Sequence, residues 1–154
     1  MRKQQKGFSL IELLIVVAII LIIAAIAIPN LMRSKMAANE ASAVASLRTL
    51  NTACISYSTT WGQFPGGLPS LGPVASGAVP TSATADLIDS VLSGGTKAGY
   101  TIVFAGGGAS TGYTITAAPL TAGVTGQRYF FTDQSGVIRV NPAGAATSGS
   151  SPLS

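Results

Sequence analysis

The residues that could do chemistry in this chain are few. The 154-residue sequence contains no histidine and a single cysteine, Cys54, which leaves little for a zinc site, a His-based catalytic triad or an intrachain disulfide. We expect Cys54 to be a small buried hydrophobe on a helix face. Three acids in the C-terminal half, Asp86, Asp89 and Asp133, offer no nucleophile with a base and no metal-ligand cluster. The sequence therefore predicts a protein that is not an enzyme and that needs no metal or cofactor.

Glu12 differs from these acids because it borders an apolar segment. Twenty consecutive uncharged residues, Leu13–Met32, separate it from Arg33, and a helix needs ~20 to cross ~30 Å of hydrocarbon. A carboxylate there costs roughly 2.5 kcal/mol or more when central, and less near an interface. One interpretation is that Glu12 reaches the cytoplasmic headgroups, or is protonated, and does nothing more. The other is that cleavage between Gly7 and Phe8 creates an ammonium that pairs with Glu12 of another subunit.

Charges around the apolar segment predict its orientation. Arg2, Lys3 and Lys6 precede it, so the positive-inside bias holds that end in the cytoplasm and sends the remainder outward. A secretory signal would end in a cleavage site with small residues, whereas here the run leads through Ile28-Pro29-Asn30-Leu31 into more helix. The formal net charge is +4, but beyond residue 7 six basic residues face five acidic ones, and no basic stripe remains for nucleic acid.

The residues Lys6-Gly7-Phe8-Ser9-Leu10-Ile11-Glu12, followed by the aliphatic run and Pro29, resemble the class III signal of type IV pilins and of type II secretion pseudopilins. The resemblance covers about residues 2–35. It implies that a membrane-embedded prepilin peptidase cleaves after Gly7 and N-methylates Phe8, that Glu12 directs assembly, and that the apolar helix remains as the filament core. It also implies a homopolymer built by an inner-membrane assembly platform and its ATPase.

A single long helix is expected from Phe8 to about Ser58, with residues 8–32 as the membrane span and 33–58 as an amphipathic continuation. Its second part carries one apolar stripe at helical spacing, made of Val44, Leu47, Leu50, Cys54 and Tyr57. Pro29 removes the hydrogen bond to the Ala25 carbonyl and favours a kink. That kink is either merely tolerated or, as the resemblance to pilins suggests, a local melting point.

The pattern changes after Thr59 to an extracytoplasmic headgroup, residues 59–140. Glycine and proline punctuation predicts a loop, and a short helix is expected from about Ala83 to Ser93 with Asp86 and Asp89 as charges in its first turns. Alternation of period two then predicts about four antiparallel strands, near residues 100–104, 113–117, 128–132 and 137–140. The tail, residues 141–154, is poor in large apolar residues and expected to be flexible. The expected fold class is α+β, with the helical stripe packed on an antiparallel sheet.

Two structural functions follow from the resemblance. The leading interpretation is a type IV pilus subunit, stored in the bacterial inner membrane as a single-pass precursor with a cytoplasmic N-terminus and then assembled into an extracellular pilus. The alternative is a pseudopilin that forms a periplasmic pseudopilus. Major pseudopilins are expected to bind calcium in their C-terminal region, and Asp133 is the one acid there, which weakens the alternative.

Overall fold

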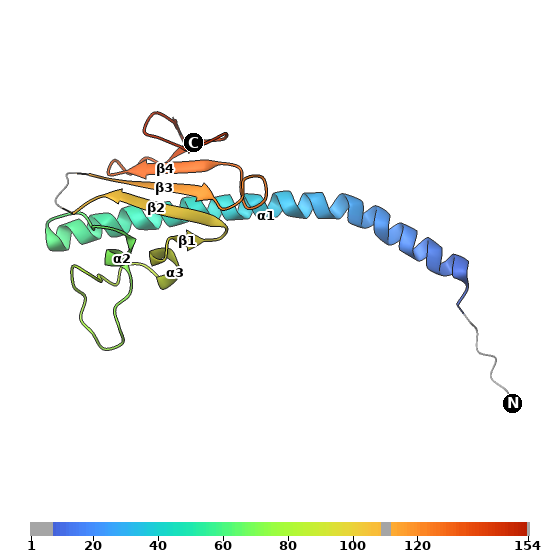
Figure 1. Ribbon diagram of the computed structural model, residues 1–154, viewed down its shortest axis with the longest axis horizontal. Helices are drawn as coiled ribbons and strands as arrows, with labels where there is room; N and C mark the ends of the chain where they lie inside the picture. The colour runs from blue at the N-terminus through green and yellow to red at the C-terminus, as the bar shows by residue number, and fades with distance from the viewer. Residues whose placement is uncertain (1–7, 109–111, 154) are drawn as a thin grey trace. The chain divides into compact units, whose positions relative to one another are not determined.

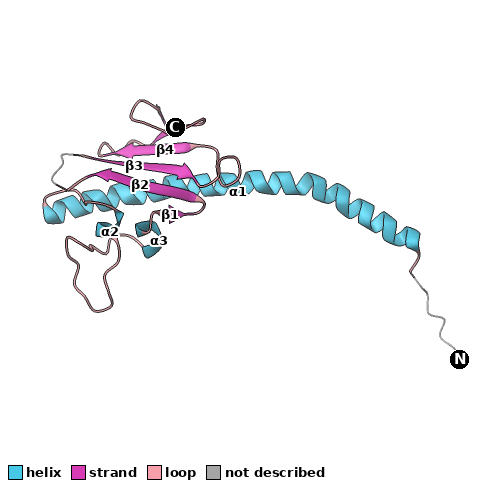
Figure 2. Cartoon of the chain, in the orientation of Figure 1, coloured by secondary structure: helices cyan, strands magenta, loops and turns pink. Residues whose placement is uncertain are grey.

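The computed structural model describes residues 8–108 and 112–153. Three helices come first, α1 (Leu10–Trp61), α2 (Leu68–Leu71) and α3 (Ser90–Ser93). Six strands follow, β1 (Thr96–Lys97), β2 (Tyr100–Gly106), β3 (Tyr113–Pro119), β4 (Tyr129–Asp133), β5 (Arg139–Asn141) and β6 (Ser151–Pro152) (Figures 1 and 2). The chain divides into a first unit, Met1–Lys35, and a second unit, Met36–Ser154, so the boundary falls inside α1.

The long helix is confirmed, with ends that lie two or three residues from the predicted ones. It runs for 52 residues and includes Pro29 in its interior. Alanine and leucine favour the helix, and the β-branched residues of the apolar run are tolerated there. Gly62 ends it: this residue has φ +70 and donates its N–H to the Ser58 carbonyl at 2.9 Å, as glycine commonly does after a helix C-terminus.

The sheet is an antiparallel meander with its six strands in sequence order. Four of them correspond to the predicted strands, and the α+β fold class is confirmed. The two others, β1 and β6, are two-residue strands at the sheet edges. Strands that short have no periodicity to read, so sequence reasoning missed them.

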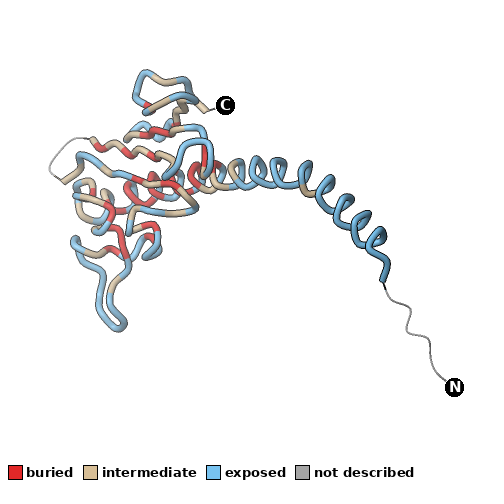
Figure 3. Tube along the Cα trace, turned by 45° about the vertical axis from the view of Figure 1, so that its right-hand side comes forward, coloured by how far each residue is buried: buried red, intermediate tan, exposed pale blue. Residues whose placement is uncertain are grey.

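The predicted helical stripe packs against the sheet. All five of its residues are buried, and Leu47, Leu50 and Cys54 are fully so. On the sheet side, Tyr113, Ile115 and Ala117 alternate with less buried neighbours in β3, as expected for a strand with one face in the core. Figure 3 shows the buried residues of the second unit gathered where helix and sheet meet. Among the described residues, this core runs from Ala43 to Ile138.

The predicted helix over 83–93 was wrong in extent, because only Ser90–Ser93 are helical. Backbone N–H groups of the preceding residues instead bond to the α2 segment: those of Ala85 and Leu87 donate to the carbonyls of Ser70 and Leu71. Asp89 is the N-cap of α3, and its carboxylate accepts from Leu92 N–H, which agrees with its expected role as a helix-terminus charge.

Asp86 was misplaced by the prediction. It precedes α3 and has φ +55, a left-handed conformation that Asp tolerates better than most residues. Its backbone N–H bonds to the Gly72 carbonyl, so it belongs to the connection between α2 and α3 rather than to a helical turn.

The expectation of a flexible tail does not hold for residues 141–153. β6 pairs with β5, and the Leu153 N–H donates to the Ile138 carbonyl at 2.8 Å. Ala146 is buried, and Leu153 packs on the core. Composition misled here because backbone hydrogen bonds to a sheet edge require no large apolar side chains.

Candidate functional site

The residues singled out at the N-terminus lie at the very start of α1. Phe8 and Ser9 precede the helix, and Glu12 occupies its first turn. Phe8 is 80% exposed. Gly7, the predicted cleavage residue, and the cationic residues Arg2, Lys3 and Lys6 lie outside the described residues.

Glu12 makes a hydrogen bond that its charge alone did not predict. Its Oε2 accepts from the Ser9 backbone N–H at 2.8 Å, while the Ser9 Oγ accepts from the Ile11 N–H at 3.4 Å. A serine followed three residues later by a glutamate is the sequence signature of a capping box, which satisfies N–H groups that a helix start leaves without partners. Sequence reasoning missed this capping box, although its signature is present as Ser9-Leu10-Ile11-Glu12.

The apolar part of α1 is exposed along its length. Within the described chain, α1 is long and apolar enough to cross a membrane. Its exposed large side chains include Leu10, Leu14, Ile19, Ile22, Ile26 and Leu31. Such a continuous apolar surface is far larger than water-soluble monomers carry, so it marks a membrane or protein contact. Pro29 lies within this exposed part.

A second set of polar contacts, which sequence reasoning missed, ties the sheet to α1 just after the first unit ends. Glu40 is buried, and its Oε1 accepts from the backbone N–H groups of Gln127 at 2.9 Å and Arg128 at 3.1 Å. Its Oε2 pairs with the Arg128 Nε at 2.7 Å. Next to it, the Asn39 side-chain amide donates to the Thr125 carbonyl at 2.8 Å. We call these contacts of Asn39 and Glu40 with residues 125–128 the helix–loop clamp.

Electrostatics favour the charged form of Glu40. Burial by itself would raise the pKa of this carboxyl, but the hydrogen bonds from Gln127 and Arg128 and the nearby guanidinium outweigh burial and hold the pKa below its usual value. We therefore expect Glu40 to be ionised in the clamp at neutral pH.

Deeper in the second unit, Asn51 links helix and sheet inside the core. Its amide donates to the Thr132 Oγ1 at 2.8 Å, and its carbonyl accepts from the Tyr113 hydroxyl at 3.1 Å. Burial raises the pKa of Tyr113, so the phenol stays neutral and remains a donor. These contacts satisfy buried polar groups, which is a structural role.

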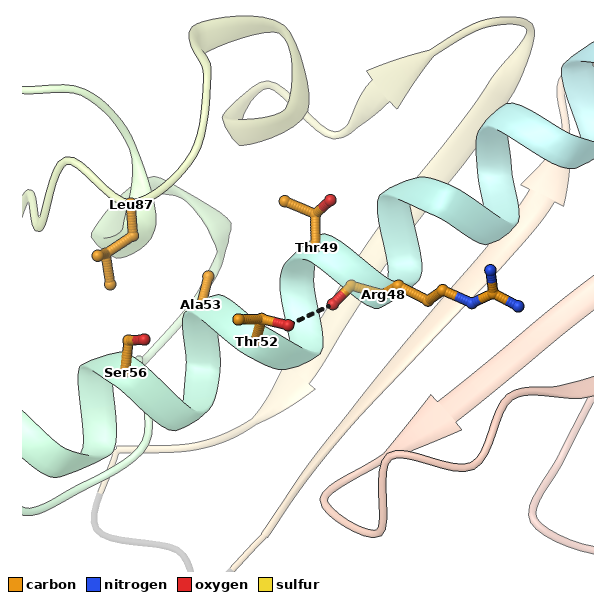
Figure 4. A pocket seen from close by; sticks show the side chains of 6 residues that line it. All are labelled: Arg48, Thr49, Thr52, Ala53, Ser56 and Leu87. Atoms are coloured by element: carbon orange, nitrogen blue, oxygen red, sulfur yellow. Dashed lines mark hydrogen bonds between the residues drawn. The ribbon is translucent and has the colours of Figure 1, made fainter.

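An open groove between α1 and the segment carrying Leu87 offers no catalytic chemistry. Its lining residues are Arg48, Thr49, Thr52, Ala53, Ser56 and Leu87 (Figure 4). The Thr52 hydroxyl donates to the Arg48 carbonyl at 3.1 Å, and the Thr49 hydroxyl donates to the Ala45 carbonyl. Both hydroxyls are therefore hydrogen-bonded within α1. Across residues 8–108 and 112–153, no three His, Cys, Asp or Glu side chains are grouped to hold a metal ion.

Comparison with known proteins identifies the N-terminal segment. Residues 2–28 match the prokaryotic N-terminal methylation motif. The chain is 48% identical to the type IV major pilin protein PilA of Myxococcus xanthus over 54 residues. This aligned segment covers 35% of this chain and 24% of that protein. It is 58% identical to the type IV wide pilus major component PilA4 of Thermus thermophilus over 38 residues. That alignment covers 25% of this chain and 29% of the relative.

The type II secretion system is represented as well. The chain is 33% identical to core protein G of the type II secretion system of Aeromonas hydrophila over 64 residues. The aligned residues cover 42% of this chain and 45% of that protein. The matches thus span less than half the length of these relatives. In its N-terminal part this chain is therefore similar to type IV pilins and type II secretion pseudopilins. The exposed apolar helix with a glutamate in its first turn agrees with that similarity.

Proposed function

We propose that this protein is a structural subunit of a type IV pilus, which polymerises through the first part of α1. The observation that carries the proposal is an exposed apolar helix long enough to span a bilayer, with one carboxylate in its first turn. Before assembly, the bilayer would cover this surface. In the filament, the same helices of sister subunits would cover it, so a single surface serves storage and polymerisation.

Processing and register are assigned to three residues as part of this proposal. A prepilin peptidase cleaves between Gly7 and Phe8 and methylates the new Phe8 amine. The resulting ammonium of one subunit pairs with Glu12 of another. Because two opposite charges attract strongly where the dielectric constant is low, and leaving either one unpaired is costly there, this pair fixes the axial position of neighbouring helices. The inner-membrane platform and its ATPase supply the work of assembly.

Pro29 contributes flexibility in the same proposal. A proline inside a helix lacks the N–H that would bond to the carbonyl four residues earlier, here that of Ala25. This weak point in the first unit would let the filament core extend locally under tension. We assign no catalytic activity to the protein.

A pseudopilin is the second candidate. The likeness to core protein G of Aeromonas hydrophila favours it, and both candidates share the same N-terminal chemistry. Fibres that are sheared from the cell surface and contain this chain would support the pilus. Filaments confined to the periplasm, together with loss of protein secretion on deletion, would support the pseudopilus.

The decisive test combines intact-mass analysis with two variants of Glu12. Filament subunits are expected to start at methylated Phe8, and a start at Met1 or Arg2 would contradict the proposal. Glu12→Ala should leave insertion and processing intact but stop incorporation into filaments when no wild-type subunit is present.

Glu12→Gln separates the charge from the capping contact. The amide oxygen can still accept from Ser9 N–H, whereas the negative charge is lost. We expect Glu12→Gln to fail in assembly as Glu12→Ala does. Normal filament yield from Glu12→Gln would contradict the proposed ion pair. Normal yield from both variants would show that Glu12 is not needed for assembly.

A further inference from the structure

Strand β2 has an outer edge that is open along part of its length. β1 pairs with the first two residues of β2, and the Ile102 N–H then donates to the Gly95 carbonyl at 2.7 Å. Within residues 8–108 and 112–153, the next hydrogen bond on that edge comes six residues later, where the Gly108 N–H donates to the Phe64 carbonyl at 2.9 Å. Six residues of strand extend about 20 Å, so an open stretch of edge lies between these two contacts.

The alternation along the strand shows which backbone groups face the open edge. Just after β2, the Gly107 N–H donates to the Gly112 carbonyl on the β3 side, whereas the Ile102 N–H faces the opposite way. Successive residues of a strand pair on opposite sides, so Phe104 and Gly106 direct their N–H and C=O groups to the open edge. In the part of the chain that the structure describes, these groups have no hydrogen-bond partner.

The devices that usually protect a strand edge are missing from β2. Edge strands commonly carry charged side chains or proline, or are covered by a helix or loop. The sequence of β2, Tyr100–Gly106, contains no charge and no proline. Val103 is 54% exposed, and Ala105 and Gly106 are exposed as well. An exposed, uncharged edge with unpaired backbone groups is a template on which another extended chain can add.

A groove of about 300 Å³ lies beside this edge. None of the described residues that line it is charged; β2 contributes Phe104 and α2 contributes Leu68. Three glycines, Gly67, Gly94 and Gly95, also line it, and because they lack side chains a second backbone can approach closely. The groove therefore fits an extended peptide of small, uncharged residues.

The loop between α2 and α3 has the matching chemistry. Residues 75–83 are exposed and uncharged, and the loop projects away from β2 (Figure 1). Val79 is 78% exposed, more than any other large hydrophobic residue described in the second unit. It follows a turn in which the Ala78 N–H donates to the Ala75 carbonyl at 2.9 Å. The N–H and C=O of Val79 have no partner within the described chain, so they are available to a strand edge.

We propose that residues Ala78–Pro80 of one subunit add to the open edge of β2 in a neighbouring subunit of the filament. The N–H and C=O of Val79 pair with the C=O and N–H of Phe104, and the Val79 side chain lies against Leu68 in the groove. Pro80 is compatible with this arrangement because its nitrogen then faces away from β2, where no donor is needed. The inference rests on the proposed polymerisation and names a contact that accompanies it.

A second copy is favoured as the occupant by the chemistry and by the filament. Alternating N–H and C=O groups along an edge are matched by a peptide backbone, and this chain presents an exposed, uncharged segment of its own. In a filament, neighbouring subunits are held close together, and this high effective concentration makes a short contact sufficient. The loop and the groove are different surfaces, so the contact is heterologous and can continue from subunit to subunit without closing.

Cysteine cross-linking in filaments tests the contact. Cys54 is fully buried, and burial raises the pKa of its thiol to about 12, so it should not react in the folded protein. With Val79 in the groove, Ala78 lies on the same side of the sheet as Val103, because successive side chains of a strand alternate. Facing and diagonal residues of paired strands have their Cβ atoms ~5–8 Å apart, within reach of a short bismaleimide.

Full-length Ala78→Cys and Val103→Cys chains are co-expressed, and filaments sheared from the cells or isolated from the periplasm are treated with the cross-linker. We expect at least fivefold more covalent dimer than from the matched control pair, Ala78→Cys with Val124→Cys, because Val124 is 50% exposed but lies in the β3–β4 loop. Ala105→Cys, on the same face of β2 as Val103, should give the same result.

Three outcomes would overturn the inference. The first is an equal yield of dimer from the Val103 pair and the Val124 pair. The second is the same yield from Val103→Cys expressed alone, which would show that two β2 edges pair with each other. The third is a cross-link from Val103→Cys to a chain of another mass, which would identify a different protein as the occupant.

The proposed function is checked in the same samples. Absence of the chain from both filament preparations contradicts the polymerisation, and the contact with it. Filaments that contain the chain, but yield no excess of dimer between positions 78 and 103, contradict the loop contact alone.

Discussion

At the scale of single residues, Glu40 links α1 to the segment before β4 through several hydrogen bonds. Its carboxylate accepts three hydrogen bonds, two from backbone N–H groups of Gln127 and Arg128 and one from the Arg128 side chain. The Arg128 side chain is 45% exposed, so solvent weakens the ion pair itself. The backbone bonds to a buried carboxylate are the larger contribution, because their donors would otherwise be left without partners.

The lowered pKa of Glu40 predicts acid sensitivity. A carboxyl with a pKa near 4.3 in the unfolded chain and a lower one in the folded protein stabilises the fold above pH ~4.3, and this contribution is lost as the pH falls through the folded-state value. Glu40→Gln should lower the free energy of unfolding at pH 7 by about 2 kcal/mol, because its amide N–H₂ faces the Arg128 donor. The variant should also show a weaker loss of stability between pH 5 and pH 3, measured by thermal unfolding in mild detergent.

Asp86→Asn is the matched control for that experiment. Asp86 is exposed and makes no ion pair within residues 8–108 and 112–153. Its substitution should leave the pH dependence close to that of the wild type. If Glu40→Gln and Asp86→Asn had the same pH profile, the clamp would not depend on the charge of Glu40.

At the scale of secondary-structure elements, the β1–β2 turn carries a strain that can be relieved. Ala98 and Gly99 connect the two strands and both have positive φ, +49 and +75, as in a type I′ hairpin turn. Glycine adopts this conformation freely, but alanine pays about 1–2 kcal/mol for it. Asparagine is the favoured residue at the first position of such a turn.

Ala98→Asn should therefore stabilise the second unit by about 1 kcal/mol, which corresponds to a rise in Tm of roughly 3 °C for a unit of this size. Ala98→Val is the opposite change, because a β-branched side chain is poorly tolerated at positive φ, and it should lower Tm. Differential scanning calorimetry of both variants checks the prediction. A lower Tm for Ala98→Asn than for the wild type would show that the turn does not limit stability.

The elements also show what a sequence can and cannot reveal. The stripe from Val44 to Tyr57 was predictable because its spacing is set by the helix itself, and the alternation in β3 is equally local. The Glu40–Arg128 pair was not predictable, because its partners are 88 residues apart and meet only once the meander is folded. The α3 boundary was missed for a related reason: the N–H groups of Ala85 and Leu87 bond to the distant α2 segment, which competes with helix formation.

The N-terminal contacts are easier to predict from the sequence than those of the sheet, because they join residues that are close together in the chain. The Ser9 and Glu12 contacts span three residues, and the family motif covers the same stretch. Its capping box could therefore have been found from the sequence. The partner that we propose for Glu12, the Phe8 ammonium of another copy of the chain, cannot be identified from a pattern within one chain.

At the scale of the whole molecule, the chain joins two units with different requirements. The described part of the first unit has an exposed apolar surface, which we propose lipid or other subunits cover, and the second unit has a core of its own. Within residues 8–108 and 112–153, the core residues lie in the second unit, from Ala43 to Ile138, with Val140 and Leu153 packed on them. In the proposed function, this separation would let the first unit exchange lipid for protein while the second unit keeps its fold.

A chain shortened to residues 36–154 should therefore fold as a soluble monomer. The cut at Met36 removes the exposed apolar residues of the first unit but keeps Asn39 and Glu40 and thus the helix–loop clamp. Because no core contact is lost, its Tm should lie within a few degrees of that of the full chain in detergent, and its amide spectrum should be dispersed. A chain shortened further, to residues 42–154, is the matched control, since it loses the clamp and should be less stable by about 2 kcal/mol or more. If both shortened chains were equally stable, the clamp would add nothing to the fold, and if residues 36–154 aggregated or remained unfolded, the second unit would need the membrane helix to fold.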